Sequence, residues 1–235
     1  MVNTAIVLAG GLGTRLRSVL PDLPKPMAPV NDRPFLEYLM DYWITQGIEE
    51  FILSIGYLSG QIINHFGDCY RGCPVQYSLE EMPLGTGGAV LAALQRLRSD
   101  APFLLLNGDT FFEVDLAALK TFHLEHASEW TFSMFRTSDS GRYMGLEVDC
   151  AGRLTDIGST LSMRGGLANG GAYLIDPVML TNCGRSVGEN FSLESEMVPN
   201  AFDRGIRVFG FESDGRFIDI GVPEDYARAL SVLRS

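Results

Sequence analysis

Long apolar runs and cysteines are both scarce in this chain of 235 residues. No apolar run approaches the roughly 20 residues that a membrane-spanning helix needs, so we expect no membrane partner. The four cysteines are too few for a disulfide framework in a chain of this length, which favours a reduced, cytoplasmic protein. An apolar strand begins almost at Met1, which leaves no room for a signal peptide. We therefore predict a cytoplasmic localisation.

Basic residues are outnumbered, since 18 Lys and Arg face 29 Asp and Glu and give a net charge of −11. A nucleic acid is not expected as a partner, because its phosphates are bound mainly by basic side chains. An acidic protein that binds a phosphorylated ligand must offset its own field locally, with clustered basic residues and a divalent cation. The hydrophobic share of 46% suits one large α/β domain.

A complete set of zinc ligands is also lacking. His65, Cys69 and Cys73 recur at four-residue spacing. A structural zinc ion usually takes four ligands, however, and Gly67 and Pro74 interrupt the helix that would align these three. We therefore do not expect a zinc site.

Apolar strands and helices alternate through the first half of the chain. We expect strands at 5–8, 51–55, 75–79 and 103–106, and helices at 34–46, 59–66, 86–97 and 115–126. Ser59 and Asp115 are placed to cap the helices that they begin. This alternation predicts a doubly wound α/β sheet.

Short strands follow in the second half, at 130–136, 145–148, 154–157 and 171–175. A helix at 193–202, a strand at 206–211 and a helix at 223–233 close the chain. Such runs indicate a small mixed or antiparallel addition to the sheet. Neither repeats nor a linker interrupt the sequence, so we predict a single domain over residues 1–235.

A glycine-rich loop follows the first strand, where Gly10, Gly11 and Gly13 precede Arg15. Glycines allow backbone N–H groups to approach an anion closely. Arg15 can grip a phosphate with two hydrogen bonds, and Lys25, framed by prolines, adds a point charge. The pattern predicts a triphosphate-binding loop rather than a plain strand-to-helix turn.

Two commoner glycine loops do not fit. The P-loop closes with Gly-Lys-Ser/Thr, and no such triplet follows Gly10. The dinucleotide fingerprint needs a third glycine where Leu16 stands.

Two aspartates are placed to hold a metal ion. Asp109 follows the strand at 103–106, and Asp219 follows Phe217 and Ile218. Ligands of open α/β sheets bind beyond the carboxyl ends of the strands, and Mg²⁺ prefers one or two carboxylates together with phosphate oxygens and water. Turn formation by an aspartate after a glycine is the alternative for Asp109.

These motifs together resemble a known family. LAGGLGTRL and LPKPM, followed by PLGTGGA, LLNGDT, NGGAY and FIDIGVPEDY, are similar to the signature of the sugar-1-phosphate nucleotidyltransferases. The run from Lys25 through Pro34 to Glu37 and the FIDIGVPEDY segment look closest to the D-glycero-α-D-manno-heptose 1-phosphate guanylyltransferase branch. The resemblance spans nearly the whole chain. It implies a Rossmann-like three-layer α/β/α fold with a mixed, mostly parallel central sheet.

The resemblance implies an enzyme that transfers a nucleoside monophosphate from a triphosphate to a sugar 1-phosphate and releases pyrophosphate. It assigns Arg15, Lys25 and Asp109 to catalysis, and Asp109 and Asp219 to Mg²⁺. Loss of a single electrostatic donor such as Lys25 typically lowers the rate by about 10²–10³. The nucleotide half would span about 1–128 and the sugar half about 129–235.

The expected nucleotide site combines the glycine loop, the PLGTGGA segment and the end of the strand at 103–106. Its residues are Leu8, Ala9, Gly10, Gly11, Gly13, Thr14, Arg15, Glu80, Gly85, Thr86, Asn107 and Gly108. Similar enzymes often carry Gln near Glu80. Guanine offers two adjacent donors, N1–H and the amine, which a carboxylate accepts as a fork, so Glu80 favours GTP. A surface role for Glu80, beside Glu81, remains open.

The expected sugar site consists of Gly145, Asn169 and Glu194, which match family positions. Relatives usually carry a Glu-Lys pair some ten residues before Asn169, and its lysine holds the sugar phosphate. No lysine stands in that region here, so Arg164 is the candidate replacement, with hydrogen bonds from Ser159 and Thr160 as the alternative.

Other functions stay open on the sequence alone. A close alternative uses UTP, dTTP or CTP with a hexose or amino-sugar phosphate. A non-catalytic regulator that binds a sugar nucleotide would explain the missing lysine, but it needs no paired metal carboxylates. A glycosyltransferase normally shows Asp-x-Asp at a strand end, which the Asn107–Thr110 segment lacks. We expect a monomer or a homodimer.

Overall fold

The computed structural model describes residues 2–11, 13, 15–16, 20–139, 142–159 and 165–233. Its strands are β1 (Thr4–Leu8), β2 (Pro29–Val30), β3 (Arg33–Pro34), β4 (Glu50–Ile55), β5 (Cys69–Tyr70), β6 (Cys73–Leu79), β7 (Phe103–Asn107), β8 (Thr110–Phe112), β9 (Trp130–Thr137), β10 (Gly145–Val148), β11 (Leu154–Ser159), β12 (Gly166–Ile175), β13 (Val208–Glu212) and β14 (Phe217–Asp219). Its α-helices are α1 (Phe35–Thr45), α2 (Ser59–Phe66), α3 (Gly85–Leu94), α4 (Leu116–Glu125), α5 (Pro177–Thr181), α6 (Val198–Asp203) and α7 (Pro223–Leu233). The 3-10 helix η1 spans Lys25–Met27 and the π-helix η2 spans Leu193–Met197.

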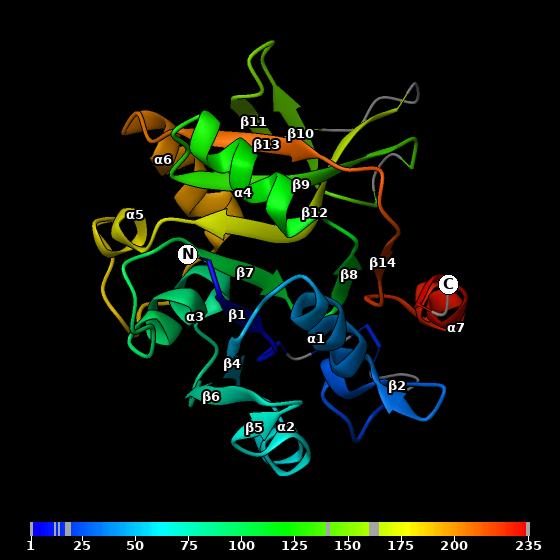
Figure 1. Cartoon of the computed structure of the whole chain (residues 1–235). Helices are drawn as coiled ribbons and strands as arrows, with labels where there is room; N and C mark the ends of the chain where they lie inside the picture. The colour runs from blue at the N-terminus through cyan, green and yellow to red at the C-terminus, as the bar shows by residue number, and fades with distance from the viewer. Residues whose placement is uncertain are drawn as a thin grey trace.

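The central sheet is mixed, with a parallel portion in the order β6-β4-β1-β7. Strand β12 pairs antiparallel with β7 along one edge and with β9 along the other. Strands β10 and β11 extend the sheet from β12, and β13 lies parallel to β9 (Figure 1). The antiparallel addition therefore continues the parallel sheet, and a separate two-stranded ribbon joins β8 to β14.

Helices cover both faces of this sheet, because side chains alternate between the two faces along each buried strand. Val7 and Leu53 point to the face covered by α1, α2, α4 and α7. Ile6 and Ile52 point to the face covered by α3, α5 and α6. This arrangement confirms the predicted three-layer α/β/α fold.

Several expected boundaries differ from the structure. Strand β12 begins at Gly166 rather than residue 171, and the helix expected at 193–202 begins as the π-helix η2. Asp115 caps α4 as predicted, accepting hydrogen bonds from the N–H groups of Ala117 and Ala118. The prediction for Ser59 is wrong, because Leu58, in a left-handed conformation, precedes α2 and no side chain caps it.

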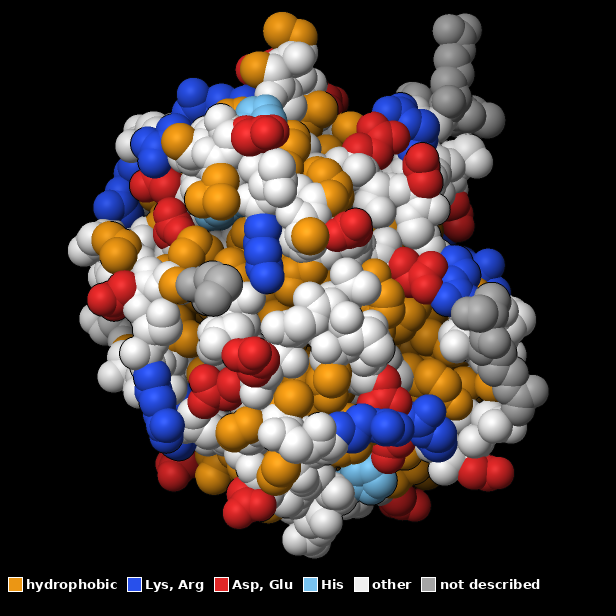
Figure 2. All heavy atoms as spheres, in the orientation of Figure 1, with side chains coloured by type: hydrophobic (Ala, Val, Ile, Leu, Met, Phe, Trp, Pro, Cys, Tyr) orange, Lys and Arg blue, Asp and Glu red, His pale blue; other side chains and the backbone are white. Residues whose placement is uncertain are grey.

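Acidic and basic side chains both lie on the surface of the molecule (Figure 2). Figure 2 shows acidic and basic side chains interspersed over the face seen in Figure 1. In one charged cluster, Arg33 of β3 and Arg71 of the turn between β5 and β6 both contact Asp41 of α1. Among the described residues, no helix is long and apolar enough to cross a membrane.

Candidate active site

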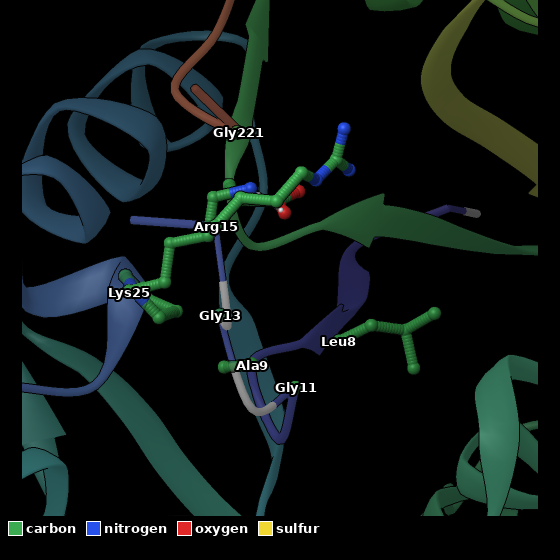
Figure 3. Close-up of a pocket in the computed structure, with 9 residues that line it drawn as sticks. Leu8, Ala9, Gly11, Gly13, Arg15, Lys25 and Gly221 are labelled. Atoms are coloured by element: carbon green, nitrogen blue, oxygen red, sulfur yellow. Dashed lines mark hydrogen bonds and ion pairs between the residues drawn. The ribbon is translucent and has the colours of Figure 1, made fainter. Parts of the chain in front are cut away.

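A hollow of about 200 Å³ lies beyond the carboxyl end of β1. Residues from the glycine loop, from η1 and from the turns after β7 and β14 line it: Leu8, Ala9, Gly11, Gly13, Arg15, Lys25, Pro26, Asp109 and Gly221. Figure 3 shows Lys25 and Arg15 extending to the same side of the loop. The position at the strand ends is where open α/β sheets bind ligands.

Lys25 joins the two aspartates at the centre of this hollow. Its ammonium group contacts the Asp109 carboxylate, and Nζ lies 3.6 Å from Oδ1 of Asp219. The Lys25 side chain is only 11% exposed, so these charges interact with limited screening by water. Lys25 therefore links residues that stand far apart in the sequence.

The β8–β14 ribbon brings the two aspartates together. Asp219 pairs in register with Thr110, the residue after Asp109, and the N–H of Ile220 donates to the Asp109 carbonyl at 3.0 Å. The N–H of Gly221 donates to Oδ1 of Asp219 at 2.6 Å and orients that carboxylate. The predicted pairing of Asp109 with Asp219 thus has a structural cause.

The environment of Asp219 favours a bound cation. Burial, followed by the negative charge of Asp109, raises the pKa of the Asp219 carboxyl above its ordinary value, whereas Lys25 opposes this shift. A carboxylate in this position is stabilised by an additional positive charge. Two carboxylates beside the glycine loop match the hard oxygen ligands that Mg²⁺ takes in proteins, so the residues present fit the predicted metal ion.

A second hollow, of about 270 Å³, adjoins the first and shares Leu8, Gly11 and Asp109 with it. Glu80 lies on its wall, where its Oε1 accepts a hydrogen bond from the Ser54 hydroxyl at 3.1 Å. Its Oε2 accepts one from the N–H of Leu84 at 3.2 Å. Glu80 therefore lines this hollow with both oxygens hydrogen-bonded to the protein, and it also lies beside Glu81 at an adjoining hollow.

Gly108 is held close to the end of β1. A Cβ at Gly108 would stand 2.7 Å from the Leu8 carbonyl oxygen, which is closer than non-bonded atoms approach, so this glycine lets the two strand ends lie close together. A Cβ at Gly10 would stand 2.3 Å from Oε1 of Glu80 and 3.3 Å from the backbone nitrogen of Gly56. The Glu80 carboxylate in its present position therefore depends on the absence of a side chain at Gly10.

The PLGTGGA segment is packed against the stretch at 189–193. The N–H of Gly87 donates to the Phe191 carbonyl at 3.0 Å, and a Cβ at Gly88 would stand 2.1 Å from the Glu189 carbonyl oxygen. Gly85 has a φ of +68° and lies against the same Phe191 carbonyl. Gly85 and Thr86 also line the second hollow, so this segment contacts both the cavity and the stretch before η2.

Two of the predicted sugar-binding residues belong to one hydrogen-bond network. Glu194 accepts from the Thr86 hydroxyl at 2.8 Å and from the Tyr173 hydroxyl at 3.4 Å. Asn169 donates to the Tyr173 oxygen at 2.8 Å. Burial, followed by the charge on Glu194, raises the pKa of the Tyr173 phenol well above its ordinary value, so Tyr173 stays a neutral donor.

The remaining predicted residues have different placements. Asn107 ends β7 and lines the second hollow, and Gly145 begins β10, where it pairs with Ala168. Gly145 does not line either of the two hollows described above. Thr14 and Arg164 lie outside the described residues.

Five residues of the site were not predicted from the sequence. Pro26 and Gly221 line the first hollow, and Pro83 and Ala89 line the second. Ser54 supports Glu80 from β4. A serine inside the apolar run 51–55 is a signal for a specific polar role, because a buried hydroxyl needs a hydrogen-bond partner.

Comparisons with known proteins agree with this geometry. Residues 4–235 match the family model described as nucleotidyl transferase. The chain is 40% identical to the D-glycero-alpha-D-manno-heptose 1-phosphate guanylyltransferase of Campylobacter jejuni, over 96% of this chain and 98% of the relative. It is 38% identical to the Aneurinibacillus thermoaerophilus protein of the same name, over 98% of each.

A solved structure is similar over almost the same length. The crystal structure of HddC from Yersinia pseudotuberculosis complexed with GMP-PN superposes with a TM-score of 0.85 at 33% identity. The match covers 98% of this chain and 99% of that one. With its paired aspartates, its basic loop and these relatives, the chain belongs to the nucleotidyl transferase family.

Proposed function

We propose that this protein transfers GMP from GTP to D-glycero-α-D-manno-heptose 1-phosphate, giving a GDP-sugar and pyrophosphate. The observation that carries this proposal is the meeting of Lys25, Asp109 and Asp219 at the end of a glycine loop. The two relatives named for this acceptor, each covered over 98% of its length, supply the identity of the sugar.

In this reaction a phosphate oxygen of the sugar 1-phosphate attacks the α-phosphorus of the triphosphate. A new P–O bond forms, the bond from the α-phosphorus to the oxygen bridging it to the β-phosphate breaks, and pyrophosphate leaves with those electrons. The nucleophile is already an anion, so no general base is required. The protein must instead offset like charges and align the two phosphates.

In this proposal Lys25 and Arg15, which line the first hollow, offset the negative charges of the two phosphates. Asp109 and Asp219 hold Mg²⁺ in this proposal, and the ion, when bound, stabilises charge on the phosphate oxygens. The contacts of Lys25 with Asp109 and Asp219 offset part of the negative charge of the two carboxylates.

Glu80 reads the base in this proposal. Its two carboxylate oxygens match the N1–H and exocyclic amine of guanine, and each oxygen retains acceptor capacity beside its intramolecular hydrogen bond. Uracil and thymine present only one such N–H, so each forms one hydrogen bond to the carboxylate where guanine forms two. The Yersinia protein, whose crystal structure is a complex with GMP-PN, supports the same base.

Glu194, Asn169 and Gly145 form the acceptor side in this proposal, with Arg164 as the candidate for the sugar phosphate. Glu194 is buried and shares its oxygens with Thr86 and Tyr173, so it is held in a fixed orientation. A fixed carboxylate suits recognition of sugar hydroxyls.

A pyrophosphate-release screen tests the proposal. GTP, UTP, dTTP, CTP and ATP would each be combined with heptose, mannose, glucose and N-acetylglucosamine 1-phosphates, with and without Mg²⁺. We expect turnover with GTP and the manno-configured heptose phosphate, and none without a divalent cation. Turnover confined to a pyrimidine triphosphate would overturn the guanine assignment, and nucleotide binding without turnover would favour a regulator.

A further inference from the structure

Ser54 is an unusual residue for its surroundings. It lies in β4 among Phe51, Ile52, Leu53 and Ile55, and all five are fully buried. A buried hydroxyl without a partner is destabilising, so its hydrogen bond explains why it is tolerated. That bond runs from the Ser54 hydroxyl to Oε1 of Glu80, at 3.1 Å.

The Glu80 carboxylate is held from two elements at once. Ser54 donates to Oε1 from β4, and the N–H of Leu84 donates to Oε2 at 3.2 Å from the loop before α3. Two donors on the two oxygens fix both the position of the group and the rotation of its plane. The backbone at Gly10 closes one side, since it leaves no room for a Cβ beside Oε1.

We propose that Ser54 is a positioning residue that sets the plane of the Glu80 carboxylate and thereby the preference for guanine. The inference rests on the proposed function, in which Glu80 accepts from two adjacent donors of the base. A fork requires both oxygens to face the base edge, whereas a rotated carboxylate accepts from one donor only. Ser54 thus contributes to selectivity without touching the nucleotide.

Inosine triphosphate provides the probe, because its base keeps N1–H and lacks the exocyclic amine. The wild-type protein should prefer GTP over ITP. We expect Ser54→Ala to raise KM for GTP by about tenfold and to bring the GTP/ITP ratio of kcat/KM close to one. The KM for the sugar phosphate and kcat at saturating GTP should stay within about twofold, since Ser54 touches neither reacting group.

Ser78 supplies a matched control. It is also buried, at 4% exposed, and lies opposite Ser54 in the register of β4 with β6. We expect Ser78→Ala to keep the wild-type GTP/ITP ratio and Ser54→Thr, which retains the hydroxyl, to restore most of it. If Ser54→Ala fails to fold, Ser54→Cys replaces it, because a thiol has similar shape and donates weakly.

The outcomes distinguish the positioning role of Ser54 from guanine recognition by Glu80. An unchanged GTP/ITP ratio in folded Ser54→Ala or Ser54→Cys would overturn the role of Ser54, and so would equal shifts in the Ser54→Ala and Ser78→Ala variants. A wild-type protein that does not distinguish GTP from ITP, with Glu80→Gln equally indifferent, would instead overturn guanine recognition by Glu80.

Discussion

At the scale of single residues, Lys25 carries the largest expected effect. Removal of its ammonium group leaves Asp109 and Asp219 without their shared cation and removes one positive charge from the first hollow. We expect Lys25→Ala to lower kcat by about 10²–10³, as loss of a single electrostatic donor typically does. Steady-state pyrophosphate release would measure it, with Lys120→Ala as the control because α4 lies outside the site. Near-normal turnover would refute the assignment.

Substitution of Asp219 by asparagine should raise the stability of the protein and lower its activity. Its pKa is raised in the folded protein, so the charged form is less favourable there than in the unfolded chain. Stability is therefore lost as pH rises through the window between the ordinary carboxyl pKa of 3.8 and the raised value. We expect Asp219→Asn to raise Tm at pH 7 and remove that pH dependence.

The same substitution should lower activity by about 10²-fold or more, because it removes one of the two proposed metal ligands. Mg²⁺ should raise Tm of the wild-type protein, because a ligand that binds only the folded state stabilises it. That shift should be absent in Asp219→Asn. Thermal melts with and without Mg²⁺ measure both effects, and an unchanged Mg²⁺ shift would contradict the ligand assignment.

Sequence reasoning reached these residues unevenly. Lys25, Asp109 and Asp219 were predictable because glycine loops and strand ends mark ligand sites in α/β proteins. The place of Ser54 in an apolar run signals a polar partner, but that partner was not predictable, because it is Glu80, 26 positions later. The close packing of Gly88 and Gly108 against backbone carbonyl groups was also not predictable, since a glycine's neighbours are set by the tertiary fold.

At the scale of elements, an ion pair between Glu113 and Arg216 closes one end of the β8–β14 ribbon. Arg216 donates to Glu113 from Nε at 2.7 Å, and this hydrogen bond is the main reason that the pKa of Glu113 is lowered. A carboxyl group whose pKa is lowered by folding stabilises the folded protein at pH values above its ordinary pKa, which is 4.5 for Glu113. This stabilisation is lost as the pH falls through the lower pKa of the folded state.

We expect Arg216→Met to reduce the free energy of unfolding at pH 7 by about 1 kcal/mol. The difference from the wild-type protein should shrink as pH falls below 4.5. Urea denaturation at several pH values would measure it. Arg136→Met is the control, because Arg136 pairs with Glu212 at an exposed site where ion pairs contribute little. A pH-independent difference would contradict the mechanism.

The glycines of helices α2 and α3 should respond in opposite directions to alanine. Gly88 in α3 has no room for a Cβ, because the Glu189 carbonyl oxygen would stand 2.1 Å away. We expect Gly88→Ala to destabilise the protein by about 1–3 kcal/mol. Gly60 in α2 has nothing within 4 Å, so Gly60→Ala should stabilise it by up to about 1 kcal/mol. Denaturation midpoints compare the two, and equal effects would contradict the packing argument.

The strands that could be predicted from the sequence are those long enough to show an apolar pattern. The strands β1, β4, β6 and β7 were predictable as apolar runs, and the capped start of α4 was predictable from Asp115. Strands β8 and β14 have only three residues each, too short for a periodic pattern to appear.

At the scale of the whole molecule, the alternating order of elements was sufficient to predict the layers. The order of the strands in the sheet was not predictable, because β12 enters between β7 and β9 only through long-range pairing. The division into a nucleotide half and a sugar half stays a prediction. Contacts of the PLGTGGA segment with 189–193 show that residues of both stretches pack together.

The β8–β14 ribbon also determines when the two aspartates of the proposed metal site can meet during synthesis. Lys25 and Asp109 leave the ribosome well before their partner Asp219, which lies far along the chain. A nascent chain that has folded β1, β4, β6 and β7 still lacks one carboxylate of the pair, and β8 still lacks its neighbouring strand. Termination anywhere before β14 therefore yields a product without the paired aspartates, however complete its glycine loop. The proposed pair of aspartates is therefore complete only after β14 has been made and has paired with β8.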